Sequence, residues 1–236
     1  MAMGIVNATS EGFGLEMAGV IRDVGPDTTG LAVGDRVSVL GTRCFSTHLV
    51  TSHHYCTKIP DSLSFEDAAT MPCVYSTALY ALLDIGRLEA GQTVLIHSAC
   101  GGVGLAAIQV SQMAGAEIYC TVGSEEKARH LEVEFSIPRT RIFNSREPSF
   151  LDDVISATDG RGVDLVLNSL SGELLHTSWK CVAEFGTMLE IGKRDLIGNG
   201  KLAMNVFGAN RSYHGVDLGL LIQRRPREAT RYKTKR

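Results

Sequence analysis

Short hydrophobic runs separated by turn residues make up the first part of the chain. Between Gly14 and about Pro60 these runs read LEMAGVIRDVG, DRVSVL, STHLV and CTKIP, with glycine and aspartate in the gaps between them. Runs of this length, bounded by Gly, Pro and Asp, are typical of β-strands joined by turns. The pattern therefore predicts an all-β region here.

A helical pattern begins at Ser64. Ser64 and Asp67 have the spacing of a capping box, in which a serine caps the helix and an acidic side chain lies three residues later. Pro72 interrupts this region. The sequence VYSTALYALLDIGRL then predicts a second helix, which leads to a turn at Glu89-Ala90-Gly91.

From Thr93 onward, strand-length hydrophobic runs alternate with helical patterns. Six strands are predicted, at 93–97, 117–122, 140–143, 163–167, 185–191 and 212–217. Strands joined by helical crossovers form parallel sheets with helices on both faces. The sequence therefore predicts an α/β protein with a doubly wound parallel sheet, preceded by a β region.

Composition narrows the function classes. The chain has 236 residues and a net charge of −3, which favours neither nucleic-acid binding nor binding to a membrane surface. No apolar run is expected to reach the roughly 18 residues of a membrane helix, and the N-terminus lacks a signal pattern. The six cysteines lack the close spacing of zinc ligands, so they are expected to be free thiols. We expect a soluble, cytoplasmic protein.

The sequence HSACGGVGLAAIQV joins the first predicted strand of the sheet to a helix. Its spacing is Ala99-x-Gly101-x-x-Gly104, so alanine replaces the first glycine of the usual dinucleotide fingerprint. Glycine at 101 allows a pyrophosphate to approach the backbone, and glycine at 104 allows the helix to pack closely on its strand. The helix N-terminus favours the anion. The predicted coenzyme-binding residues of this turn are Gly101, Gly102, Val103 and Gly104.

The end of the second predicted strand indicates which dinucleotide binds. An acidic residue there would bind the ribose 2′-hydroxyl of NAD, but Ser124 occupies this point. Lys127 follows within one turn, and Arg146 comes just after the third strand. A hydroxyl, an ammonium and a guanidinium suit a 2′-phosphate, which predicts NADPH. The alternative is that Lys127 and Arg146 are ordinary solvated surface charges.

Several motifs in order resemble a known family. The segments are GFGLEMAGVIRDVG, AATMPCVYSTALYAL, VLIHSACGGVGLAAIQ, IFNSREPSF, GVDLVLNSLSGELL and MLEIGKRDL. Between about Met1 and Leu221 the chain resembles the enoyl reductase domains of fatty acid and polyketide synthases, above all those of highly reducing fungal polyketide synthases. These multifunctional enzymes of fungal secondary metabolism carry zinc-independent members of the medium-chain dehydrogenase/reductase superfamily.

The resemblance implies a division of the chain. A partial GroES-like substrate domain is expected at residues 1–73 and an NADP-binding Rossmann domain at 74–222. The last residues, 223–236, are rich in basic side chains and are expected to form a disordered tail. Domains of this family are longer than this chain, so the β domain is expected to lack its first and last parts.

The resemblance also implies a reaction. NADPH gives hydride to the β-carbon of an enoyl thioester held on an acyl carrier protein, and the α-carbon is then protonated. The family's candidate proton donors correspond to Lys193 and Asp217, of which Lys193 could also stabilise the enolate. Further coenzyme-binding residues are expected on the nicotinamide side: Thr77, Asn168, Ser169 and Gly192. Expected partners are the carrier protein and other domains of a synthase, with a homodimer left open.

No metal is predicted. Zinc-dependent relatives have a histidine before the glutamate of the G-x-E-x-x-G turn, whereas Leu15 precedes Glu16 here. His53 and His54 are adjacent, and on a strand their side chains would point to opposite faces and could not share an ion.

Two other functions stay open. A quinone oxidoreductase of the same superfamily shares the glycine turn, although NSREPSF and EIGKRDL favour the synthase interpretation. Because the walls of the substrate site come largely from the β domain, the chain could instead be a coenzyme-binding or structural module with little catalysis.

Overall fold

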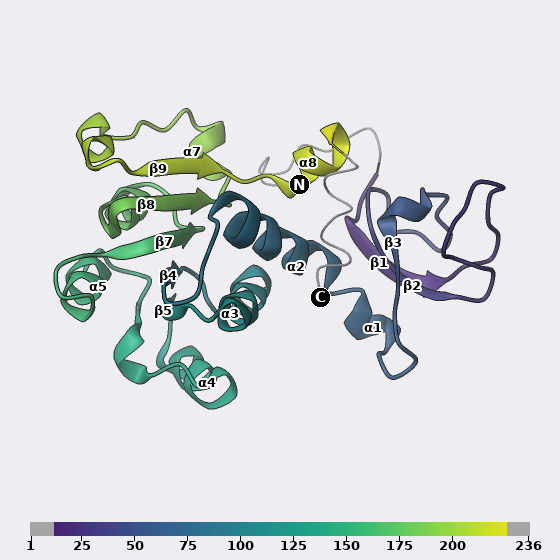
Figure 1. Ribbon diagram of the computed structural model, residues 1–236, viewed down its shortest axis with the longest axis horizontal. Coiled ribbons are helices and arrows are strands. Elements are labelled where there is room, and N and C mark those ends of the chain that lie inside the picture. The colour runs from purple at the N-terminus through teal and green to yellow at the C-terminus, as the bar shows by residue number, and fades with distance from the viewer. Residues whose placement is uncertain (1–11, 226–236) are drawn as a thin grey trace. The chain divides into compact units, whose positions relative to one another are not determined.

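The computed structural model describes residues 12–225 of the chain (Figure 1). Its packing divides these residues into two compact units, with boundaries after residue 76 and after residue 216. The second unit, Thr77–Val216, is continuous, whereas the first combines residues before and after it. The sequence-based domain boundaries, after residues 73 and 222, stay a prediction.

The first unit contains a three-stranded antiparallel sheet. Its strands are β1 (Glu16–Val20), β2 (Arg36–Leu40) and β3 (Cys56–Lys58), in the order β1-β2-β3. On the central strand the alternate side chains of Val37 and Val39 are buried, as expected for a sheet with one covered face. The predicted β region is therefore present.

The segment between β2 and β3 differs from the prediction. STHLV, residues 46–50, forms no strand; of its two large apolar side chains, Val50 is fully exposed and Leu49 is only partly buried. A strand pairs stably when one face is buried, and this segment offers no such face. His53–Tyr55 forms a short 3₁₀ helix, η1, which the strand interpretation missed.

Two short helices follow the sheet. The predicted capping box is confirmed at α1 (Phe65–Ala68), where Ser64 Oγ accepts from the N–H of Asp67 at 3.0 Å. Pro72 is the first residue of α2 (Pro72–Leu79), a position that tolerates proline because its missing N–H has no partner in a helix. The π-helical turn η2 (Tyr80–Ile85) continues α2 into the second unit. The first unit also contains α8 (Leu218–Arg224).

Phe65–Ile85 is long and apolar enough, by length and composition alone, to cross a membrane, with a mean hydropathy of 1.2. The expectation that no such run exists was therefore wrong. The structure divides this segment at Pro72, places Glu66 and Asp67 in its first turn, and buries Ala81 and Leu82 completely. A buried helix of a protein core has the same composition, so the segment is weak evidence for a membrane span.

The second unit is built on a six-stranded sheet whose strands pair in parallel, in the order β6-β5-β4-β7-β8-β9. The strands are β4 (Thr93–Ile96), β5 (Glu117–Val122), β6 (Ile142–Asn144), β7 (Val163–Asn168), β8 (Val182–Glu190) and β9 (Ser212–Gly215). The helices are α3 (Gly102–Ala114), α4 (Glu125–Phe135), α5 (Phe150–Ala157), α6 (Glu173–Lys180) and α7 (Arg194–Ile197), with 3₁₀ turns η3 (Arg139–Arg141) and η4 (Met204–Ala209).

Helices cover both faces of this sheet. α3 contacts β4, β5 and η2, and α4 contacts β5, whereas α5 and α6 contact each other and pack on β6, β7 and β8. Phe150 of α5 and Trp179 of α6 are fully buried against Leu95, Val166 and Met188 of the strands. The predicted doubly wound fold, with a separate antiparallel sheet before it, is confirmed.

Strand ends differ from the prediction by a few residues. β6 begins at Ile142 because Arg139–Arg141 forms η3 instead of the expected start of the strand. β8 begins at Val182, three residues before the expected Phe185, whose left-handed backbone (φ 62°) interrupts the hydrophobic alternation. At the C-terminus α8 continues through Arg224, past residue 223 where the tail was expected to start, and residues 226–236 of the predicted tail lie outside the described residues.

Candidate coenzyme site

The turn between β4 and α3 brings a helix against the end of its strand. Ser98 has a left-handed backbone (φ 52°), and the N–H of Gly101 donates to its carbonyl oxygen at 2.8 Å. A Cβ at Gly104 would lie 2.6 Å from the carbonyl oxygens of both Ser98 and Ala99. α3 can pack this closely because residue 104 has no side chain, which is the role of the last glycine in a dinucleotide fingerprint.

The N-terminus of α3 is open to an anion. Gly101 is the N-cap, no side chain caps the first turn, and both Gly101 and Gly102 are exposed. The 13-residue helix directs its dipole and first N–H groups toward this point. The four predicted residues of the turn, Gly101 to Gly104, therefore fit a pyrophosphate.

The three residues predicted to favour NADPH over NADH lie at the ends of β5 and β6. Ser124 is the N-cap of α4, and its Oγ accepts from the N–H of Lys127 at 3.4 Å. The Arg146 guanidinium covers Gly123, because a Cβ there would lie 2.8 Å from Nε and 3.1 Å from Nη2. The guanidinium thus lies over the residue that precedes Ser124, and the side chains of Ser124, Lys127 and Arg146 are all exposed.

The acidic residue that directly follows Ser124 has a cationic partner. Glu125, directly after Ser124, forms an ion pair of 2.9 Å with Arg139. The hydrogen bond and charge of Arg139 hold the pKa of Glu125 below its usual value. The carboxylate next to Ser124 is therefore compensated by Arg139 and not by Arg146, whose guanidinium lies over Gly123.

The first residues predicted to lie near the nicotinamide are at the end of β7. Ser169 Oγ donates to Ser98 Oγ at 2.9 Å, which links β7 to the glycine turn. Asn168 is completely buried. Its Nδ2 donates to the carbonyl oxygen of Leu170 at 2.9 Å and to Glu190 Oε2 at 2.5 Å. The carboxamide of Asn168 is thus used inside the protein, and its contact with a coenzyme stays a prediction.

Glu190, the last residue of β8, is the buried carboxyl group of this region, with 1% of its surface exposed. Its Oε1 accepts from the N–H of Gly192 at 2.6 Å, and its Oε2 accepts from the hydroxyl of Tyr213 at 3.4 Å as well as from Asn168. Burial raises the pKa of Glu190 to about 7, although these three hydrogen bonds act in the opposite direction. Sequence reasoning missed this residue; the available signal was a glutamate that ends the apolar run of a central strand.

Gly192 and Lys193 follow Glu190 directly. A Cβ at Gly192 would lie 2.5 Å from Glu190 Oε1, so this glycine is packed on the carboxylate. Lys193 is half-buried and is the N-cap residue of α7. Gly192 and Lys193 therefore lie at the carboxyl end of β8, next to the end of β7 that holds Asn168 and Ser169.

The other two predicted residues lie elsewhere in the chain. Thr77 is buried in α2, at the start of the second unit. Asp217 belongs to the first unit, where its side chain caps α8 by accepting from the N–H of Leu220 at 3.1 Å. The catalytic roles of Lys193 and Asp217 stay predictions.

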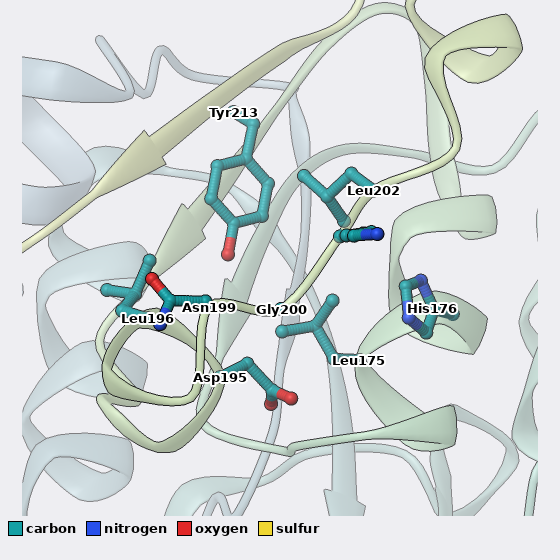
Figure 2. A pocket seen from close by; sticks show the side chains of 9 residues that line it. Leu175, His176, Asp195, Leu196, Asn199, Gly200, Leu202 and Tyr213 are labelled. Carbon is teal, nitrogen blue, oxygen red and sulfur yellow. The ribbon is translucent and has the colours of Figure 1, made fainter.

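A cavity of about 240 Å³ lies within the second unit, beside this network (Figure 2). Tyr213 of β9 and Asp195 of α7 face it, and Asp195 Oδ2 also accepts from the N–H of Gly172 at 2.9 Å. The complete lining is Leu175, His176, Asp195, Leu196, Asn199, Gly200, Lys201, Leu202 and Tyr213. Tyr213 therefore connects the cavity to Glu190.

Among residues 12–225, no three or more His, Cys, Asp or Glu side chains are grouped so as to hold a metal ion. The prediction that His53 and His54 lie on a strand and point to opposite faces was wrong, because they lie on η1 and their ring centroids are 4.1 Å apart. All six cysteines are free, as expected. Glu16 of the G-x-E-x-x-G turn instead accepts from the N–H of Cys73 at 2.8 Å.

Comparisons with known proteins agree with this fold and site. The sequence profile of the family described as zinc-binding dehydrogenase matches residues 102–230. The chain is 56% identical over 231 residues to the highly reducing polyketide synthase lcsB of Purpureocillium lilacinum. The alignment covers 98% of this chain and 9% of that protein. The chain thus spans less than a tenth of the length of this curated relative.

Solved structures similar to this chain also include enoyl reductases of this kind. The CurK enoyl reductase superposes with a TM-score of 0.84 at 37% identity, over 94% of this chain and 65% of that chain. The nucleotide-binding subdomain of the enoylreductase domain of PpsC from Mycobacterium tuberculosis has a TM-score of 0.65 at 37% identity, over 69% of this chain and 89% of that chain. A quinone oxidoreductase from Pseudomonas syringae is less similar, at 28% identity and a TM-score of 0.75, over 90% of this chain and 66% of that chain.

The fold and the glycine turn define an oxidoreductase domain with a site for a nicotinamide dinucleotide. More specifically, the chain belongs to the zinc-binding dehydrogenase family, within the medium-chain dehydrogenase/reductase superfamily, and groups there with the enoyl reductase domains of polyketide synthases. The residues described here do not fit the metal in the family's name.

Proposed function

We propose that the chain reduces the enoyl thioester of a polyketide or fatty acyl chain held on an acyl carrier protein, with NADPH as the reductant. A bound NADPH would supply the hydride. The similarity to enoyl reductase domains supports the substrate class, and the greater similarity to them than to a quinone oxidoreductase favours the enoyl substrate. As in such synthases, the chain would act as one domain of a larger cytoplasmic enzyme.

The choice of NADPH over NADH rests on one observation, the Arg146 guanidinium over Gly123 beside Ser124. A guanidinium presents several donors to a phosphate in a fixed plane, and Ser124 adds a hydroxyl that can donate. Lys127 adds a positive charge one turn along α4. Arg139 compensates the neighbouring Glu125, which reduces the repulsion between that carboxylate and a 2′-phosphate.

The chain's own contribution to the chemistry would come from Lys193. An ammonium at the carboxyl end of β8 can stabilise negative charge on the thioester oxygen and return a proton to the α-carbon. Asp217 is the second candidate donor, although its carboxylate already accepts from Leu220 N. Open parallel sheets bind ligands at this edge, which supports the placement of Lys193.

Two measurements test the proposal. Fluorescence titration should give tighter binding of NADPH than of NADH. NADPH oxidation should then be faster with crotonyl-pantetheine than with a simple quinone. Equal affinity for the two coenzymes would remove the NADPH assignment, and faster quinone turnover would replace the enoyl substrate.

A Lys193→Met variant separates binding from chemistry. It should bind NADPH with unchanged affinity and lose most of its turnover with crotonyl-pantetheine. Exposed Lys180, on α6, provides the matched control, since Lys180→Met should change neither quantity. Full turnover in Lys193→Met would transfer the proton-donor role to another group.

A further inference from the structure

Glu190 joins the ends of three neighbouring strands. It is the last residue of β8, where it is paired with Asn168 of β7 and Gly215 of β9. Its side chain bonds to Asn168, and the N–H of Val216 donates to its carbonyl oxygen at 2.8 Å. A single buried residue thus contacts the strand end before Ser169, the loop that begins with Gly192, and the end of β9.

The three side-chain partners of Glu190 are all donors: the carboxamide nitrogen of Asn168, the backbone N–H of Gly192 and the hydroxyl of Tyr213. An ionised carboxylate is the side chain that only accepts, and it has two oxygens for the purpose. A glutamine of the same shape would direct its NH₂ group at Asn168 or at Gly192, whichever way its amide is turned. Above its pKa of about 7, where Glu190 is ionised, its side chain therefore matches these donors better than an amide does.

The network has little room to adjust. Asn168 is fully buried, with its nitrogen shared between Glu190 and the carbonyl oxygen of Leu170. Gly192 lies so close to the carboxylate that even a methyl group there would meet Glu190 Oε1. The N–H of Ile191 donates to the carbonyl oxygen of Asn168 at 3.0 Å, which joins the two loops a second time. Displacing the carboxylate would therefore displace the backbone that leads into Lys193.

We propose that Glu190 is a positioning residue for the nicotinamide half of the coenzyme: its carboxylate fixes the loop that begins at Gly192 and the end of β7 at Asn168, and it does not act at the adenine half. This inference rests on the proposed function. It assigns Glu190 no contact with coenzyme or substrate, and its effect is transmitted through Gly192 and Asn168.

The test compares two ligands of the same chain. NADPH occupies both halves of the site, whereas adenosine 2′,5′-bisphosphate occupies only the half that contains Ser124, Lys127 and Arg146. In Glu190→Gln, calorimetry should show NADPH binding weakened by about tenfold or more, since a buried donor loses its acceptor. Binding of adenosine 2′,5′-bisphosphate should stay within a factor of about two, inside the range of a surface change.

Glu184→Gln is the matched control, because it makes the same substitution on the same strand at an exposed position. It should leave the affinity of both ligands unchanged. Equal weakening of both ligands in Glu190→Gln would mean a general loss of structure, and unchanged binding of both would mean that the carboxylate positions nothing; either result overturns the inference.

The proposed function can fail separately. A wild-type chain that binds NADPH but does not oxidise it with crotonyl-pantetheine would refute enoyl reduction. The difference between the two ligands in Glu190→Gln would in that case still support the positioning role, because it is measured without turnover.

Discussion

The candidate coenzyme site lies along the carboxyl edge of the parallel sheet, and the two ends of this edge differ in burial and in hydrogen bonding. At the ends of β5 and β6, the candidate residues Ser124, Lys127 and Arg146 are exposed, and two of them carry long charged side chains. At the ends of β7 and β8, Asn168 and Glu190 are buried and tied to each other by a hydrogen bond of 2.5 Å. One end is an open cluster of positive charge, and the other is a closed network of hydrogen bonds.

This difference indicates how each end should respond to substitution of its side chains. Exposed charges act on a ligand through solvent, so their effects are modest, sensitive to salt and nearly independent of each other. A buried network loses several partners when one member changes, so its effects are larger and coupled. Under the proposed function, the coenzyme would be selected at the open end, and its reactive half would be held in position at the closed end.

The largest expected effect is at Gly104, in the glycine turn between β4 and α3. Gly104→Ala should lower the free energy of unfolding by about 3 kcal/mol, because its Cβ would meet two backbone carbonyl oxygens that cannot move aside. The gain in helix propensity, about 1 kcal/mol, is smaller. Urea unfolding measures the change.

Gly208→Ala is the control for this variant, since a Cβ there would meet nothing within 4 Å. It should leave the unfolding midpoint unchanged or slightly raised. If Gly104→Ala were as stable as Gly208→Ala, the close packing of α3 on the Ser98–Ala99 backbone would not require glycine at this position.

The next effect is the pH dependence of stability that comes from Glu190. Its pKa is raised from about 4.5 to about 7 in the folded protein, so the folded state binds more protons than the unfolded state between these values. The free energy of unfolding should therefore fall as pH rises through this window, by about 2.5 kcal/mol between pH 5 and pH 8. Urea unfolding at several pH values measures it.

Glu190→Gln should remove this part of the pH dependence. The other titratable groups that face Glu190, Asp195 and Tyr213, are present in both proteins, so the difference between the two curves isolates Glu190. Parallel curves for wild type and variant would show that the pKa of Glu190 is the same in the folded and the unfolded chain, so that burial does not raise it.

At the open end the expected effect is smaller. Arg146→Leu should weaken NADPH binding by about tenfold, or about 1.4 kcal/mol, and leave NADH binding unchanged, because only NADPH carries the 2′-phosphate. The preference of the wild type for NADPH should decline as salt is added. Fluorescence titration at low and high ionic strength measures both effects, and an equal loss for NADH would place Arg146 outside the phosphate site.

The closed end was the harder of the two to predict from sequence. The six strands of the parallel sheet could be located from the sequence, because each is a short apolar run between two helical patterns. The glycine spacing also located the turn, since few residues other than glycine fit it. Glu190 escaped because a glutamate at the end of an apolar strand is most often a solvated charge, and only the fold shows three donors converging on it.

Local patterns failed for a related reason in the first unit. Residues 46–50 have the composition of a strand, yet strand formation depends on a partner and a covered face, which sequence does not display. His53 and His54 were placed on a strand for the same reason, although their 3₁₀ turn is set by Ser52, whose side chain accepts from His54 N. Long-range packing decided the first case, and a local side-chain cap decided the second.

The smallest expected effect is at Gly123, under the Arg146 guanidinium. The Cβ of Gly123→Ala would lie 2.8 Å from Arg146 Nε, but the end of a long exposed side chain can move aside at little cost. NADPH binding should therefore weaken by less than about threefold, a surface-scale effect. The double variant Gly123→Ala/Arg146→Leu should bind NADPH like Arg146→Leu alone, because the alanine acts only by displacing the guanidinium. Titration of the four proteins gives the coupling energy. A further loss in the double variant would mean that the alanine disturbs the end of β5 itself, and that the open end is as tightly packed as the closed one.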